Sequence, residues 1–173
     1  AGVARNAGIK HASGEYLWFV DGDDYVLPGS LRNMAHSLKR HSPDMYIFGY
    51  VFYFEKNDCH DKMIPRDYDV LNSLPAGMPL SQDDKNTLTW LSGFPWNKVF
   101  KKRFVLEHGL LFQDVAIHND LRFYLESLHK ASTVVLSKSW RHKPHYAHLQ
   151  HPKNSKSLTH LGEETSFAVF DVL

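Results

Sequence analysis

Three carboxylates, Asp21, Asp23 and Asp24, lie within four positions of one another, directly after an apolar run. That run, 16–20, has five consecutive apolar or aromatic residues and indicates a buried strand of a parallel sheet. Ligands of open α/β sheets bind just beyond the carboxyl ends of the strands, so the acids lie where a ligand is expected. Gly22 permits a sharp turn, and Asp21 and Asp23 could direct oxygens to one point, as Mg²⁺ and Mn²⁺ prefer. The alternative is a solvated acidic turn, because Asp-Gly is a common turn pair.

The composition indicates one folded domain. The 173 residues suffice for a hydrophobic core, and the 43% of hydrophobic and 13% of aromatic residues exclude a disordered polymer. The formal net charge of +1 gives no reason to expect a nucleic-acid partner, whose footprint is a basic face.

The cysteine and hydropathy patterns set further bounds. Cys59 is the only cysteine, which excludes an intramolecular disulfide and a Cys-x-x-Cys zinc site and fits a reducing compartment. The longest apolar run, 45–54, is too short to span a bilayer, which needs about 20 residues. No signal peptide is visible, and because Ala1 is not an initiator Met we expect a fragment of a longer parent.

Helices and strands alternate around the acidic stretch. Small and apolar residues at helical spacing predict a helix over 2–12, and an amphipathic helix follows the turn at 27–30. The aromatic-rich run 45–54 predicts one strand. The prolines and polar residues of 59–89 predict a long irregular loop of the kind that carries lids or binding residues.

The second half predicts shorter elements. Its patterns indicate a short helix at 104–108, an amphipathic helix at 120–128 and a strand at 133–136. A His-rich basic stretch occupies 140–151, and 163–173 is expected to form one more helix.

These motifs, in this order, resemble the large family of inverting, GT-A-fold family 2 glycosyltransferases. The residues that carry the resemblance run along nearly the whole chain: Ala4-Arg5-Asn6-x-Gly8, Gly14-Glu15-Tyr16, Phe19 to Asp24, Pro28, Trp96 to Lys102, Gly109-Leu110-x-Phe112, Asn119-Asp120-Leu121 and Asn154-Ser155-x-Ser157. An ordered series of this kind is more specific than any single motif. It implies an α/β, GT-A fold with a mostly parallel, Rossmann-like sheet flanked by helices, whose first strands are missing from this chain.

The resemblance also implies an organisation and an activity. Residues 1–173 would form a single glycosyltransferase domain fragment: the end of the nucleotide-sugar half at 1–58, an irregular insert at 59–89, and the acceptor half with a C-terminal helix at 90–173. The implied activity is a metal-dependent, hexosyltransferase-type transfer that builds polysaccharide. The donor would be a nucleotide-sugar, first of all a UDP-sugar, and the acceptor a glycan or a lipid-linked saccharide. The implied setting is cytoplasmic, with peripheral association at the inner face of the membrane.

Roles for the acidic residues follow from matching them to the family motifs. Asp21-x-Asp23 matches the DxD motif that binds Mn²⁺ or Mg²⁺ and the donor diphosphate, with Asp24 nearby. Asp120 matches the general base that takes the proton of the acceptor hydroxyl; taken alone, it would be an ordinary helix N-cap. Asn119 departs from the family, which usually has Glu there, and it is expected at the substrate.

Other residues have two interpretations each. Arg5 could face the diphosphate or form an ordinary ion pair with Asp21 or Asp24. The resemblance implies a metal or phosphate contact from one of His142, His145 and His148, of which His145 is our expected metal ligand, although most histidines there would be structural. Trp90 and Trp96 could stack on an acceptor sugar, and core packing near Phe94 and Phe100 is the alternative for Trp96.

Three other functions are alternatives to a glycosyltransferase. A nucleotidyltransferase also uses paired Asp residues and a metal, but the phosphate loop rich in Gly and Lys is not visible in this sequence. A catalytically impaired binding domain is favoured by Asn119 and opposed by the intact acids. An EF-hand is excluded because the twelfth position from Asp21 is Arg32 and not Glu.

Overall fold

The computed structural model describes residues 1–54, 59–115 and 117–150, and it alternates helices with short strands. In chain order the elements are α1 (Gly2–His11), β1 (Tyr16–Trp18), β2 (Tyr25–Val26), α2 (Ser30–His41), β3 (Met45–Ile47), β4 (Tyr50–Phe54), β5 (Cys59–Lys62), α3 (Pro65–Asn72), α4 (Gln82–Thr87), the 3-10 helix η2 (Leu88–Trp90), β6 (Lys98–Lys101), α5 (Lys102–Glu107), α6 (Leu121–Lys130), β7 (Val134–Leu136) and β8 (Tyr146–Leu149). The predicted helix at 163–173 and the motif at 154–157 lie outside the described residues.

The strands form two mixed sheets. The first has the order β1-β6-β3-β7 and the second the order β2-β8-β4-β5. Within these sheets β3–β7 and β4–β8 are parallel, and the other pairs are antiparallel. The α/β class is confirmed, whereas the expectation of a mostly parallel sheet is corrected because β6 enters between β1 and β3 antiparallel to both.

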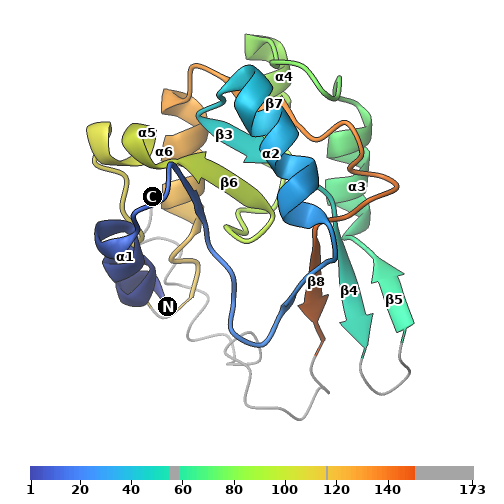
Figure 1. The fold of residues 1–173 in the computed structure, drawn as a ribbon, viewed down its shortest axis with the longest axis horizontal. Helices are drawn as coiled ribbons and strands as arrows, with labels where there is room; N and C mark the ends of the chain where they lie inside the picture. Colours follow the sequence, from blue (N-terminus) through green and yellow to red (C-terminus); the bar gives the residue numbers. More distant parts are fainter. Residues whose placement is uncertain (55–58, 116, 151–173) are drawn as a thin grey trace.

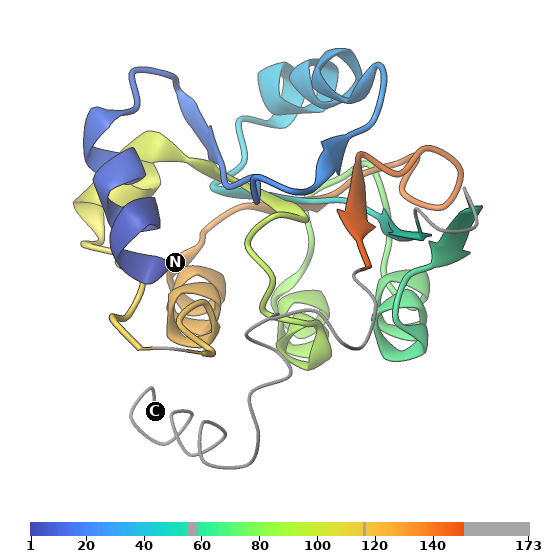
Figure 2. The same ribbon diagram turned by 90° about the horizontal axis from the view of Figure 1, so that it is seen from below.

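The helices cover both faces of the sheet layer. Figure 2 shows α2 on one face and α3, α4 and α6 on the other. Most of the buried side chains are apolar; Met34 of α2 and Phe123 of α6 are examples. No helix among the described residues is long and apolar enough to cross a membrane.

The aromatic run 45–54 crosses from one sheet to the other, where the sequence predicted a single strand. β3 ends at Ile47 in the first sheet and β4 begins at Tyr50 in the second. Figure 1 shows β4, β5 and β8 together, away from β3 and β6. The crossing is at Gly49, whose carbonyl accepts a hydrogen bond of 3.0 Å from the backbone N–H of His145.

The predicted irregular loop at 59–89 is instead mostly helical. Pro65 is the first residue of α3, where its missing N–H costs no hydrogen bond, so it begins this helix and does not break it. Ser81 and Asp84 form a capping box at α4, with Asp84 N–H donating to Ser81 Oγ at 3.2 Å and Ser81 N–H donating to the Asp84 carboxylate at 2.9 Å.

We expect Gly49→Ala to destabilise the fold by about 1–3 kcal/mol, the usual cost of overpacking a core. An added Cβ would lie 2.2 Å from the carbonyl oxygen of Trp140, which is backbone and cannot rotate away. Urea unfolding followed by circular dichroism measures the change.

Gly8→Ala is the matched control, since a Cβ at this position in α1 meets nothing within 4 Å. It should stabilise the protein by about 0.5–1 kcal/mol because it favours helix. Equal effects of the two substitutions would contradict the close approach at the sheet crossing.

Candidate active site

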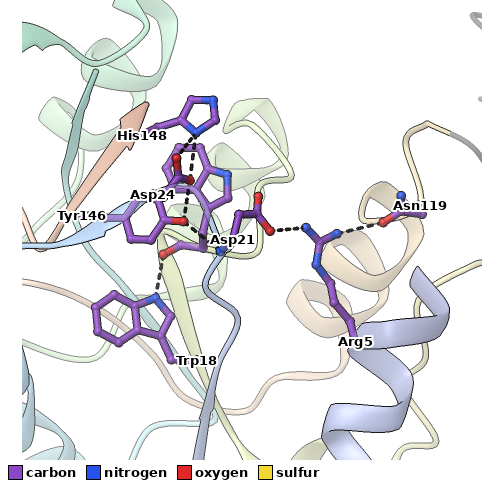
Figure 3. A network of polar contacts seen from close by, with 8 residues as sticks. Arg5, Trp18, Asp21, Asp24, Asn119, Tyr146 and His148 are labelled. Carbon is purple, nitrogen blue, oxygen red and sulfur yellow. Dashed lines mark hydrogen bonds and ion pairs between the residues drawn. The ribbon is translucent and has the colours of Figure 1, made fainter. Parts of the chain in front are cut away.

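Arg5 joins two segments that the sequence keeps far apart. From α1, its guanidinium donates one hydrogen bond of 2.8 Å to Oδ1 of Asp21 and another of 2.9 Å to Oδ1 of Asn119 (Figure 3). The Arg5 and Asp21 side chains are 15% and 35% exposed, so the ion pair is partly shielded from water. The planar fork of an arginine suits two acceptors at once, which a lysine ammonium could not hold in the same geometry.

Asp21 and Asp23 remain on the open side of the acidic turn. Asp23 is exposed, and Asp21 is only half-buried. The turn is closed by a hydrogen bond of 3.2 Å from Asp24 N–H to the Asp21 carbonyl. The backbone N–H of Asp21 also donates to the hydroxyl of Tyr146 at 3.1 Å. These backbone hydrogen bonds hold the turn in place, while the side chains of Asp21 and Asp23 keep surface exposed to solvent.

Asp24 has a different place from the one that the sequence predicted. Its side chain has no exposed surface, and its carboxylate accepts hydrogen bonds from Tyr146 Oη at 2.5 Å, His148 Nδ1 at 2.9 Å and Leu149 N–H at 2.8 Å. A buried carboxylate with three donors is satisfied internally. Asp24 thus anchors the acidic turn to β8 and does not face a ligand.

His148 in β8 and His145, which immediately precedes this strand, lie in different environments. Burial lowers the pKa of His148, but the hydrogen bond that His148 donates to Asp24 and the negative charges of Asp24, Asp21 and Asp23 outweigh burial, so this pKa is raised. His145, our predicted metal ligand, lies fully buried with its ring 5.1 Å from that of Phe48, and neither ring nitrogen has a hydrogen-bond partner. Burial lowers the pKa of His145 to about 4. The histidine that contacts the acidic turn is therefore His148, not the one we predicted.

Trp96 packs in the aromatic core, the alternative that the sequence left open. It is 3% exposed and stacks on Phe94 at 4.6 Å and on Tyr146 at 4.9 Å between ring centroids. Its carbonyl accepts a hydrogen bond of 2.7 Å from Nε1 of Trp18. Because other rings cover the indole, Trp96 supports β8 beneath the acidic turn and offers no face to a sugar. Trp90, by contrast, is 70% exposed.

Asp120 stands at the start of α6 without capping it. It occupies the N-cap position, yet its side chain makes no cap hydrogen bond. Burial raises the pKa of Asp120, while the positive charges of Arg5, Lys98 and His118 act in the opposite direction. A half-buried carboxylate that the helix does not use is available for other chemistry, and its neighbour Asn119 is held by Arg5.

Lys98 is a fully buried charged residue near Asp120 that was not among the residues predicted for the site. Its ammonium donates to the carbonyls of Ser92 at 2.8 Å and Phe94 at 2.7 Å, and to Oδ1 of Asn97 at 2.6 Å. Burial lowers the pKa of Lys98 to about 7, against the raising effect of Asp67 and Asp120. The available signal was its position in the Trp96-Asn97-Lys98 motif.

A second buried carboxylate completes this polar network. Asp67 accepts hydrogen bonds from the hydroxyl of Tyr50 at 2.8 Å and from the N–H and hydroxyl of Ser92 at 3.0 and 2.9 Å. Together with Lys98 it fixes the segment 92–97. Gly93 of this segment packs within 3.5–3.8 Å of Leu121 and Tyr124 in α6, as measured from an ideal Cβ position, so the network supports the helix that Asp120 begins.

The acidic turn fits a divalent cation only in part. In the described part of the chain no group of three or more His, Cys, Asp or Glu side chains is placed to hold a metal ion. Mg²⁺ in phosphate-binding sites is usually held by one or two carboxylates together with substrate phosphates. Asp21 and Asp23 fit that donor set, whereas Asp24 and His145 do not.

Comparison with known proteins gave consistent matches. A sequence model of Glycosyl transferase family 2 matches residues 1–103. The uncharacterized glycosyltransferase EpsJ of Bacillus subtilis is 28% identical over 134 residues, which cover 76% of this chain and 38% of EpsJ. EpsH of the same organism is 29% identical over 112 residues, or 64% of this chain and 30% of EpsH.

Solved structures show the same fold. The crystal structure of S. aureus TarS 1–349 in complex with UDP-GlcNAc matches with a TM-score of 0.76 and 16% identity, over 99% of this chain and 44% of the TarS chain. The complex of TarS 1–349 with UDP matches with a TM-score of 0.63 and 17% identity, over 88% of this chain and 40% of that chain. This chain thus spans less than half the length of each of these relatives.

We predict that the His148–Asp24 pair stabilises the protein more at acid than at alkaline pH. The folded-state pKa of His148 lies above its ordinary value of 6.5, so the contribution is fully present below 6.5 and is lost as the pH rises through the folded pKa. The loss should be about 1.4 kcal/mol per unit by which the pKa is raised. The measurement is the difference in unfolding free energy between wild type and His148→Gln across that pH range.

An NMR titration of the histidine side chains supplies the control. His148 should titrate above 6.5 and His145 near 4, and Asp24→Asn should lower the pKa of His148. If the two histidines titrate together, the assignment of Asp24 to His148 is wrong.

Proposed function

Because the chain belongs to glycosyltransferase family 2, we propose that it transfers a sugar from a nucleotide-diphosphate donor to an acceptor hydroxyl. The observation that carries the proposal is Arg5, which holds Asp21 of the acidic turn and Asn119, next to Asp120, on one guanidinium. Motifs from the first and the second half of the chain therefore lie at a single place, as one reaction centre requires. A UDP-sugar is the donor that we propose first, since TarS was crystallised with UDP-GlcNAc.

The donor diphosphate would bind at the acidic turn. Asp21 and Asp23 would hold Mn²⁺ or Mg²⁺, which when bound neutralises charge on the departing diphosphate. Arg5 would orient Asp21 through its ion pair and add positive charge beside the phosphates. The anchoring of Asp24 to β8 would keep the turn in the same position with and without donor.

Asp120 would act as the general base. In the proposed step the acceptor oxygen attacks the anomeric carbon as its proton moves to the Asp120 carboxylate and the sugar–phosphate bond breaks, so the nucleoside diphosphate leaves. Burial raises the pKa of Asp120, which makes its carboxylate a better proton acceptor, and the charges of Arg5 and Lys98 help to keep it ionised. Attack from the side opposite the leaving group would invert the anomeric configuration.

Asn119 would serve the site through its amide oxygen. A neutral carbonyl accepts the Arg5 hydrogen bond at 2.9 Å where the family usually has a carboxylate. Arg5 is then neutralised by Asp21 alone, which leaves more of its positive charge for the donor phosphates. The acceptor that we propose is the hydroxyl of a glycan or of a lipid-linked saccharide, handled at the cytoplasmic face of a membrane.

We predict that Asp120→Asn lowers kcat by about 10²–10⁴-fold, the usual contribution of a general base, and leaves donor affinity unchanged. Asp23→Ala should instead weaken the binding of UDP-sugar in the presence of Mn²⁺. The measurements are nucleoside-diphosphate release and calorimetric titration of the donor.

The matched control is Asp83→Asn, an exposed carboxylate in the first turn of α4. It should retain full activity and affinity. A wild type that binds no nucleotide-sugar, together with variants that behave identically, would overturn the proposal and favour the catalytically impaired binding domain.

A further inference from the structure

A basic hollow lies between α2 and the segment 137–143 that follows β7. It has a volume of about 510 Å³ and shares no lining residue with the candidate active site. The helix α2 covers one face of the sheet layer, whereas α6, which Asp120 begins, lies on the other (Figure 2). The hollow is therefore a separate feature of the molecule.

The charges that line the hollow are all of one sign. Arg32 and Arg40 come from α2, and Lys138 and Lys143 come from 137–143; His36 and His41 add two titratable groups. None of the lining residues is Asp or Glu. The chain as a whole has a formal net charge of only +1, so this is a local concentration of charge.

These four cations have no partner within the part of the chain that the structure describes. Other cationic side chains do form ion pairs: Arg5 with Asp21, for example, and Arg122 with Glu126. Among residues 1–54, 59–115 and 117–150, no ion pair or side-chain hydrogen bond involves Arg32, Arg40, Lys138 or Lys143. Like charges around one hollow repel one another and attract anions, an effect that a concave surface strengthens.

The floor of the hollow provides neutral hydrogen-bonding groups. Tyr46 and Ser137 are each 1% exposed, and burial raises the pKa of Tyr46 against the lowering effect of the Ser137 and Ser37 hydroxyls. Ser139 Oγ lies 3.4 Å from Ser137 Oγ. Hydroxyl protons can rotate toward an incoming oxygen, so the floor can donate to an anion without a change of backbone.

Gly77 allows the chain to pass close to Lys138 at one edge of the hollow. Gly77 has a φ of +80°, and a Cβ at this position would lie 3.0 Å from Cβ of Lys138. Its N–H donates to the carbonyl of Leu136 at 2.8 Å, which keeps the chain against the start of the segment 137–143. The base of Lys138 is thereby packed in place at the edge of the hollow.

We propose that this hollow binds a phosphate or diphosphate group of a phosphorylated ligand. Arginine and lysine are the residues that recognise phosphate oxygens, and neutral hydroxyl donors complement them. The volume falls within the roughly 300–1,000 Å³ of small-molecule sites. The phosphate could belong to a soluble compound or to a lipid headgroup, and the experiment separates these sources. The proposal does not depend on the transferase activity.

The test is a ¹⁵N NMR titration with sodium pyrophosphate, without divalent cations, on wild type, Lys143→Glu and Lys10→Glu. Lys143 and Lys10 are both exposed and carry the same charge change, but Lys10 lies in α1, outside the hollow. Wild type should show saturable shifts at the amides of Ser137, Lys138 and Arg40. Lys143→Glu should weaken this binding at least tenfold, and Lys10→Glu should change it less than twofold.

A second arm uses vesicles of phosphatidylcholine with and without phosphatidylglycerol. Cosedimentation that requires phosphatidylglycerol and is lost in Lys143→Glu assigns the phosphate to a lipid headgroup. Pyrophosphate shifts without such cosedimentation assign it to a soluble ligand. The proposal is overturned if wild type shows no saturable shifts at these amides, or if Lys143→Glu and Lys10→Glu weaken binding equally.

Discussion

The buried carboxylate of Asp24 is the constraint on which the candidate site depends. A charge without exposed surface must be satisfied by donors, and Asp24 has three, all from β8. These hydrogen bonds connect the acidic turn to a strand that lies more than a hundred residues later in the sequence. Because Tyr146 and His148 also stack on Trp96, the turn rests on the aromatic core. Asp21 adds its own backbone hydrogen bond to Tyr146 and its ion pair with Arg5, so its position is fixed from both sides.

The groups that we propose to react were easier to predict from the sequence than the groups that support them. Arg5, Asp21 and Asp120 were predicted from an ordered series of motifs, and the structure brings Arg5 to Asp21 and to Asn119 beside Asp120. Asp24 could not be distinguished from its neighbours, because composition does not reveal which of three adjacent acids is buried.

The point at which β8 begins explains the error over the histidines. Side chains alternate along a strand, so Tyr146 and His148 share one side of β8, whereas His145 comes immediately before the strand. With Pro144 in this stretch, the first residue of β8 could not be predicted, so the sequence did not show which histidine would face the acidic turn. The residues 45–54 are apolar without a break, so nothing in the sequence indicated that the chain crosses between sheets at Gly49. In 59–89, prolines that begin or flank helices were interpreted as loop residues.

The Arg5–Asn119 hydrogen bond has a consequence for folding. The two residues are 114 positions apart, and Asp24 lies 122 positions from Tyr146. Contacts between residues so far apart in the sequence close large loops, which costs chain entropy. They therefore stabilise the fold only after most of the chain has become compact. A partly folded chain would therefore have neither the paired guanidinium nor the anchored turn. If the proposed function holds, binding at this site would therefore require the completely folded chain, and a partly folded chain would lack the activity.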